Sequence, residues 1–86
     1  MNNPCRLPDV ELTKVDEESI LYDSNTGLIH MLNPTGAVIW ELLDGNHSLE
    51  DIAQRVQKEF EIDFETALRD TQEFVNILRE KGLLAT

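Results

Sequence analysis

The stretch "LNPTGAVIWELLDG", residues 32–45, has the pattern of a helix with a marked start and a marked end. Asn33 is a favourable N-cap, and Pro34 suits the first helical position, where its missing N–H costs nothing. Apolar side chains then recur at helical spacing until Gly45, a residue type that commonly follows a helix. The residues upstream of Asn33 are instead typical of strands. We therefore predict a small sheet followed by this helix.

Three short upstream segments are rich in strand-forming side chains. They are residues 10–15 (VELTKV), 19–23 (SILYD) and 28–32 (LIHML), and polar turns at 16–18 and 24–27 separate them. β-branched and aromatic residues favour strands, and connections this short join antiparallel neighbours. The sequence predicts an antiparallel sheet whose first and third strands are edges.

Two more helices are predicted downstream. Ser48 and Asp51 have the spacing of a capping box at the start of a helix that reaches Phe60. Asp63 caps a last helix that ends near Gly82. The expected fold class is therefore α+β, with a three-stranded antiparallel sheet followed by three α-helices.

The length of 86 residues fits one domain with a modest core. We place this domain at residues 9–86, after a flexible lead-in at residues 1–8 that Pro4 and Pro8 interrupt. No apolar run approaches the roughly 18 residues of a membrane span, and the start lacks the pattern of a secretory signal. We expect a cytoplasmic protein.

The charge balance is strongly acidic, with 17 Asp and Glu against 7 Lys and Arg and a formal net charge of −10. Such a chain repels phosphate backbones, so nucleic acid is a poor partner. A winged-helix DNA reader would need a basic recognition helix, whereas the last helix is acidic overall. A basic peptide or a basic patch on an enzyme is a better partner, although the acidity can also serve solubility alone.

The residues offer little for catalysis or metal binding. His30, His47 and the single cysteine, Cys5, have no metal-ligand spacing, and no nucleophile–base pair or Gly-rich phosphate loop is present. We predict no catalytic residues, no metal site and no cofactor. "HSLED" at residues 47–51 resembles the modified serine motif of acyl carrier proteins, but His47 replaces its Asp. An ordinary N-cap explains Ser48 equally well, and a carrier with Ser48 modified stays a remote alternative.

The third predicted strand is apolar on both faces. Leu28, His30 and Leu32 point one way, and Ile29 and Met31 point the other. A sheet covered on one side should alternate apolar with polar residues, and edge strands usually carry residues that block pairing. Either the last helix covers the second face, or this edge receives another chain.

The last predicted helix also has more apolar surface than one packing face needs. Phe74 and Ile77 lie beside the main apolar stripe, in line with Ala67, Asp70 and Lys81. A deeper core or the wall of a groove explains this excess. A groove would let an extended peptide pair with the third strand and place alternate side chains against the helix. We expect nanomolar to low micromolar affinity for such a peptide.

The order of several short motifs resembles the PqqD-like family, peptide chaperones that are also called RiPP recognition elements. The resemblance covers about residues 10–84. The motifs that carry it are Leu32-Asn33, Thr35-Gly36-Ala37, Leu42 to Gly45, Ser48 with Asp51-Ile52, Asp70, Phe74, Leu78 and Gly82-Leu83.

The resemblance implies a winged-helix-like fold that binds the leader of a ribosomally synthesised precursor peptide as an added strand. It implies a non-catalytic adaptor that presents the precursor to a maturation enzyme, as a monomer or weak dimer. By position, the backbone of the third strand would pair with the leader. Its pockets would be shaped by Ile29, Met31, Asp70, Phe74 and Ile77, with Lys81 at the rim. The implied peptide-binding residues are Leu28, Ile29, His30, Met31, Leu32, Ala67, Asp70, Phe74, Ile77 and Lys81.

Two branches of the family stay open. PqqD proper assists pyrroloquinoline quinone synthesis with a radical SAM enzyme. The stretch "NPTGAVIW", with Pro34 and Trp40, is more similar to the stand-alone proteins of lasso-peptide pathways. Those proteins deliver the precursor to a leader peptidase and then to a cyclase, so we favour the lasso-peptide branch.

Overall fold

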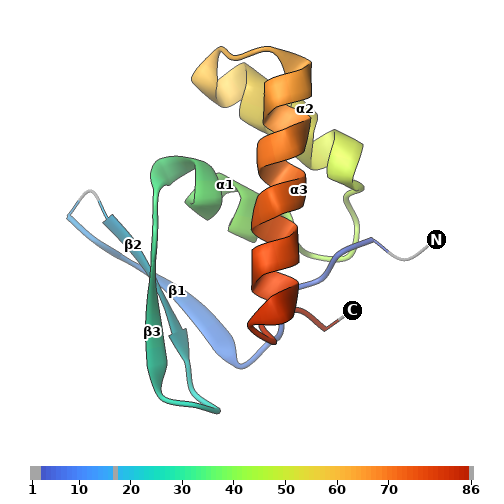
Figure 1. Cartoon of the computed structure of the whole chain (residues 1–86). Coiled ribbons are helices and arrows are strands. Elements are labelled where there is room, and N and C mark those ends of the chain that lie inside the picture. The colour runs from blue at the N-terminus through green and yellow to red at the C-terminus, as the bar shows by residue number, and fades with distance from the viewer. Residues whose placement is uncertain (1–2, 17, 86) are drawn as a thin grey trace.

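The computed structural model describes residues 3–16 and 18–85. Its elements are β1 (Val10–Val15), β2 (Glu18–Asp23), β3 (Leu28–Leu32), α1 (Pro34–Leu42), α2 (Leu49–Phe60) and α3 (Phe64–Glu80). Predictions that fall on residues 1, 2, 17 and 86 lie outside the described residues. Figure 1 shows the sheet on one side of the molecule and the three helices beside it. The predicted α+β class and element order are confirmed.

The sheet is antiparallel, with the strand order β1-β2-β3. Leu21 of β2 is paired with Leu12 on one side and with His30 on the other, and its side chain is fully buried. Tyr22, the next residue along β2, is paired with Ile29 and is exposed. Alternation along the strands therefore gives the sheet an inner face toward the core and an outer face toward solvent.

Each helix begins at the cap that the sequence predicts. The Asn33 Oδ1 accepts a hydrogen bond from the Gly36 N–H at 2.7 Å at the start of α1. Ser48 and Asp51 form the capping box of α2, and Asp63 caps α3. These side chains satisfy N–H groups that the first turn of a helix leaves without backbone partners.

The core lies between the inner face of the sheet and the helices. Trp40 of α1 is 2% exposed, which places it in the core rather than at an interface. The larger buried side chains around it are Leu21, Ile39, Leu43, Ile52, Val56, Val75, Leu78 and Leu83. Leu83 and Leu84 follow α3 and fold back on this core.

The flexible lead-in predicted for residues 1–8 is wrong for residues 3–8. The Arg6 N–H donates to the Leu43 carbonyl at 2.7 Å, and the Leu7 N–H donates to the Leu83 carbonyl at 3.1 Å. The segment thus joins the loop after α1 to the C-terminal residues through isolated backbone bridges. Single bridges leave no periodic pattern in a sequence. The flexible lead-in was therefore predicted only from the two prolines that interrupt this segment.

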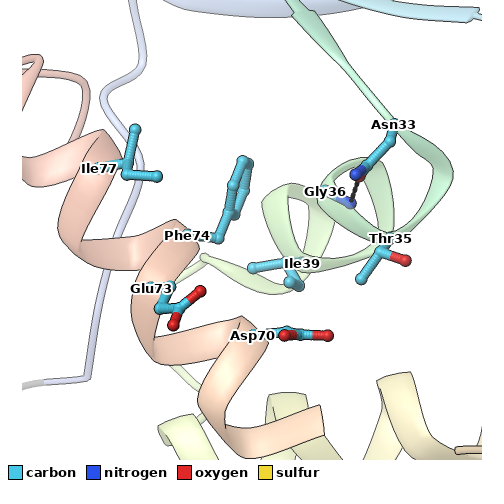
Figure 2. Close-up of a pocket in the computed structure, with 8 residues that line it drawn as sticks. All are labelled: Asn33, Thr35, Gly36, Ile39, Asp70, Glu73, Phe74 and Ile77. Atoms are coloured by element: carbon cyan, nitrogen blue, oxygen red, sulfur yellow. Dashed lines mark hydrogen bonds between the residues drawn. The ribbon is translucent and has the colours of Figure 1, made fainter. Parts of the chain in front are cut away.

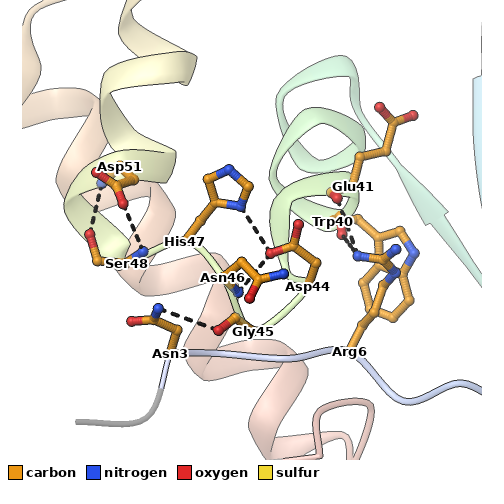
Figure 3. Close-up of polar contacts among 10 residues, drawn as sticks. All are labelled: Asn3, Arg6, Trp40, Glu41, Asp44, Gly45, Asn46, His47, Ser48 and Asp51. Atoms are coloured by element: carbon orange, nitrogen blue, oxygen red, sulfur yellow. Dashed lines mark hydrogen bonds and ion pairs between the residues drawn. The ribbon is translucent and has the colours of Figure 1, made fainter.

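Arg6 also closes the C-terminal end of α1 (Figure 3). Its guanidinium donates to the carbonyl oxygens of Trp40 and Glu41 at 3.3 and 3.2 Å. Carbonyls at a helix end lack intrahelical partners, and a cation there also compensates the helix dipole. The segment therefore stabilises α1 from its C-terminal side, while Asn33 does so from the other.

Candidate functional site

The edge of β3 is open. Within the described residues, β3 pairs with β2 on one side and with no strand on the other. Its side chains Leu28, Ile29 and Met31 are 57%, 63% and 67% exposed. An edge strand presents N–H and C=O groups that a further chain can pair with. This edge is therefore available to an additional strand.

A hollow of about 300 Å³ lies between the start of α1 and one face of α3. Figure 2 shows the side chains of Phe74 and Ile77 on α3 directed toward the first turn of α1. We call it the α1–α3 hollow. Its lining residues are Asn33, Thr35, Gly36, Ile39, Asp70, Glu73, Phe74 and Ile77. Because Asn33 directly follows β3, the hollow begins where the open strand ends.

Gly36 sets how closely the two walls of the hollow approach. A Cβ at this position would lie 3.1 Å from the Asn33 Oδ1 and 3.3 Å from the Phe74 Cε1. Both distances are shorter than ordinary van der Waals contact. The absence of a side chain at Gly36 therefore lets the Phe74 ring pack beside the first turn of α1.

The α3 wall of the hollow carries two carboxylates. Asp70 is half-buried and Glu73 is exposed, and neither forms a hydrogen bond or ion pair with another residue that the structure describes. The described lining includes no lysine or arginine. The hollow therefore combines the apolar side chains of Ile39, Phe74 and Ile77 with two carboxylates that no cation of the described lining compensates.

The structure brings together three of the predicted helix residues and separates the others. Asp70, Phe74 and Ile77 line the hollow. Ala67 is 0% exposed and belongs to the core, which argues against its predicted contact with a peptide. Lys81 is exposed at the C-cap of α3, outside the lining. Ala67 lies one turn before Asp70, where the packing face of α3 is fully covered.

The predicted strand residues divide between the two faces of the sheet. Ile29 and Met31 lie on the outer face, paired with Tyr22 and Ile20 of β2. They do not line the hollow with Phe74, which differs from the pockets we expected them to share. Their exposure also shows that α3 does not cover this face. The half-buried His30 points inward, so its side chain is a packing residue.

Sequence reasoning missed the α1 wall of the hollow. The predicted peptide-binding residues do not include the lining residues Asn33, Thr35, Gly36, Ile39 and Glu73. The available signal was the glycine in the first turn of a helix, where it is unfavourable unless a close approach requires it.

A second polar cluster lies in the loop between α1 and α2 (Figure 3). The His47 ring lies 2.9 Å from the Asp44 carboxylate. This contact, with the Asn46 N–H, holds the pKa of Asp44 below its ordinary value. The Ser48 Oγ accepts from the Asp51 N–H at 3.1 Å. This hydrogen bond favours a capping role for Ser48 over a carrier function.

Metal-ligand groups and membrane-spanning helices add no candidate site among the described residues. Within residues 3–16 and 18–85, no three His, Cys, Asp or Glu side chains are grouped as metal ligands. In the same part of the chain, no helix is long and apolar enough to cross a bilayer. The open edge of β3 and the α1–α3 hollow are therefore the candidate site.

Comparisons with known proteins agree on one family. The family model described as coenzyme PQQ synthesis protein D (PqqD) matches residues 18–84. TbiB1, solved in complex with the TbiA(beta) leader peptide, is 30% identical with a TM-score of 0.81, and 94% of each chain is covered. Lasso peptide synthetase B1, complexed with the leader peptide, is 30% identical with a TM-score of 0.83. That match covers 98% of this chain and 99% of the other.

A search of curated proteins finds no match. The family model spans most of the chain, from β2 to the residues that follow α3, and includes every residue of the α1–α3 hollow. The two solved chains match over nearly their whole length. The resemblance seen in the sequence is thereby confirmed, and the chain belongs to the PqqD family.

Proposed function

We propose that this protein binds the leader segment of a ribosomally synthesised precursor peptide as a fourth strand beside β3. It then presents the precursor to a separate maturation enzyme. The observation that carries the proposal is the open, apolar edge of β3 beside the α1–α3 hollow. Two structures with 30% sequence identity hold leader peptides, which supports the same ligand class here.

Strand addition divides the recognition into two parts. Ladder hydrogen bonds to β3 provide affinity with little dependence on sequence, while side-chain pockets provide specificity. Successive side chains of an extended peptide point to opposite faces, so every second leader side chain points toward the helices. There Phe74 and Ile77 offer apolar surface, and the intervening side chains extend the outer face of the sheet beside Ile29 and Met31.

The protein acts as an adaptor without chemistry of its own and works in the cytoplasm, where precursor peptides are made. Its enzyme partner is a leader peptidase followed by a cyclase. The similarity to lasso peptide synthetase B1 favours this branch. PqqD proper, with a radical SAM partner, is the alternative that the family model also fits.

The proposal predicts a short precursor reading frame beside this gene, and the test uses the leader that it encodes, which we call the cognate leader. A fluorescently labelled synthetic leader is titrated with the protein, and anisotropy gives Kd. Amide NMR of the labelled protein then locates the contact. We expect the largest shifts at Leu28–Leu32 and around Phe74 and Ile77.

Single N-methylation of the leader backbone tests the ladder without altering the protein. Alternate residues of an added strand direct their N–H toward β3, so methylation should weaken binding at every second position. Uniformly small effects, or NMR shifts confined to α2, would refute strand addition. A precursor gene beside a radical SAM gene, and not beside a peptidase and cyclase, would select the alternative branch.

A further inference from the structure

The carboxylates of the α1–α3 hollow have consequences for the guest peptide. Asp70 and Glu73 lie one turn apart on the same wall, and Asp70 is half-buried without a compensating cation. Neighbouring like charges on a helix repel, and a guest that covers them removes more of their water. A purely apolar guest residue would therefore remove water from both carboxylates without supplying a compensating charge. A cationic guest residue would instead compensate the negative charge of both carboxylates.

The spacing along α3 fixes where this cation belongs in the guest. Asp70 precedes Phe74 by four residues, which corresponds to about 6 Å along a helix that rises about 1.5 Å per residue. Same-face side chains of an extended peptide are separated by about 6.6 Å, at about 3.3 Å per residue. Figure 1 shows β3 and α3 extending in a similar direction. A side chain that packs on Phe74 thus has its same-face neighbour near Asp70.

We infer that the hollow selects a leader segment with Lys or Arg two residues from a large apolar anchor. The anchor packs against Phe74 and Ile77, and the cation pairs with Asp70 and Glu73. The formal net charge of −10 attracts such a segment from a distance. This inference rests on the proposed function, because it requires an extended leader beside β3.

A random 12-residue peptide library displayed on messenger RNA tests the inference. It is selected in parallel against the wild-type protein and an Asp70→Asn/Glu73→Gln double variant, which keeps side-chain shape and removes both charges. We expect wild-type winners to share Lys or Arg two positions from a large apolar residue. Winners against the double variant should keep the apolar residue and lose the cation.

The outcomes separate this inference from the proposed function. Edge-binding winners with the same cation frequency for both proteins would overturn the charge selection and leave strand addition standing. Failure to select any peptide that shifts the amide resonances of Leu28–Leu32 would overturn both. Glu11→Gln on β1 is the matched control, because it removes one exposed charge far from the hollow. It should leave the winning motif unchanged.

A charge exchange then tests direct pairing with one selected peptide. Replacing its Lys by Gln should raise Kd for the wild-type protein about threefold to tenfold, as expected for a partly exposed ion pair. The same replacement should have no effect on the double variant. The Asp70→Lys variant should bind the original peptide more weakly than the wild-type protein does. It should regain affinity for a peptide in which Glu replaces the Lys. Equal losses in every combination would show that the acids act only through net charge.

Discussion

Ile77 offers the most direct test of the leader site, because its side chain is half-exposed in the free protein. It is 47% exposed and lies at the edge of the α1–α3 hollow. Leader binding should cover the exposed half. We therefore expect Ile77→Ala to weaken binding of the cognate leader while the protein remains folded.

The magnitude follows from the area that remains to be buried. Complete burial of an aliphatic side chain contributes about 1.5–3 kcal/mol, so the exposed half of Ile77 contributes about 0.7–1.4 kcal/mol. At about 1.4 kcal/mol for each factor of ten, Kd should rise about threefold to tenfold. Ile77→Ala also removes the part of the side chain that is already buried, so the free energy of unfolding should fall by a similar amount.

Val15 provides a matched control. It is 49% exposed, but it lies at the end of β1, on the edge of the sheet opposite to β3. Both alanine variants are measured by leader anisotropy and by urea unfolding. Val15→Ala should lower stability about as much as Ile77→Ala and leave Kd within twofold of the wild-type value, about 0.4 kcal/mol.

Two results would contradict this reasoning. Equal binding losses in both variants would mean that affinity follows stability and not contact. An unchanged Kd for Ile77→Ala would place the leader away from α3. In that case the apolar excess on this helix would belong to the fold alone.

Three further changes test the surroundings of the site. Gly36→Ala should weaken leader binding because the added Cβ displaces the Phe74 ring. The thermal unfolding temperature should change little, because the helix preference of alanine, about 0.5–1 kcal/mol, offsets this crowding. Arg6→Ala should destabilise the protein by about 1 kcal/mol, or about 4–8 °C in Tm, because the Trp40 and Glu41 carbonyls lose the guanidinium, and Trp40 keeps its bond from the Leu43 N–H. Thr66→Val should raise the pKa of Asp63, which the Thr66 hydroxyl now lowers, as a carboxyl NMR titration would detect. Stability that depends on this depressed pKa is present above pH 3.8 and is lost as the pH falls through the folded-state pKa, so Thr66→Val should shift that loss to higher pH.

The sequence predicts local structure well here because each element carries its own signals. Asn33, Ser48 and Asp63 mark helix starts through side-chain hydrogen bonds within three residues, so the evidence is contiguous in the chain. The strands are short, but turn residues separate them clearly. The predicted strand boundaries therefore agree with the structure, apart from one residue at the start of β2.

Contacts between distant segments are less predictable. The bridges of residues 3–8 join backbone groups, and backbone hydrogen bonding does not depend on side-chain identity. Ala67 and Phe74 lie on the same side of α3, two turns apart, and only the packed structure shows that one is covered and the other borders a hollow. The width of an apolar arc indicates excess surface without assigning each residue to core or groove.

The arrangement of β3 and α1 explains how one small domain can read a leader sequence in a fixed register. Leu32 ends the open strand, and the next residue, Asn33, both caps α1 and lines the hollow. A guest strand that slips by one residue turns every side chain to the opposite face. A slip by two residues moves the anchor about 6.6 Å along the edge, away from Phe74. Because the ladder and the hollow are joined through a single residue, correct pairing along β3 and correct filling of the hollow require each other.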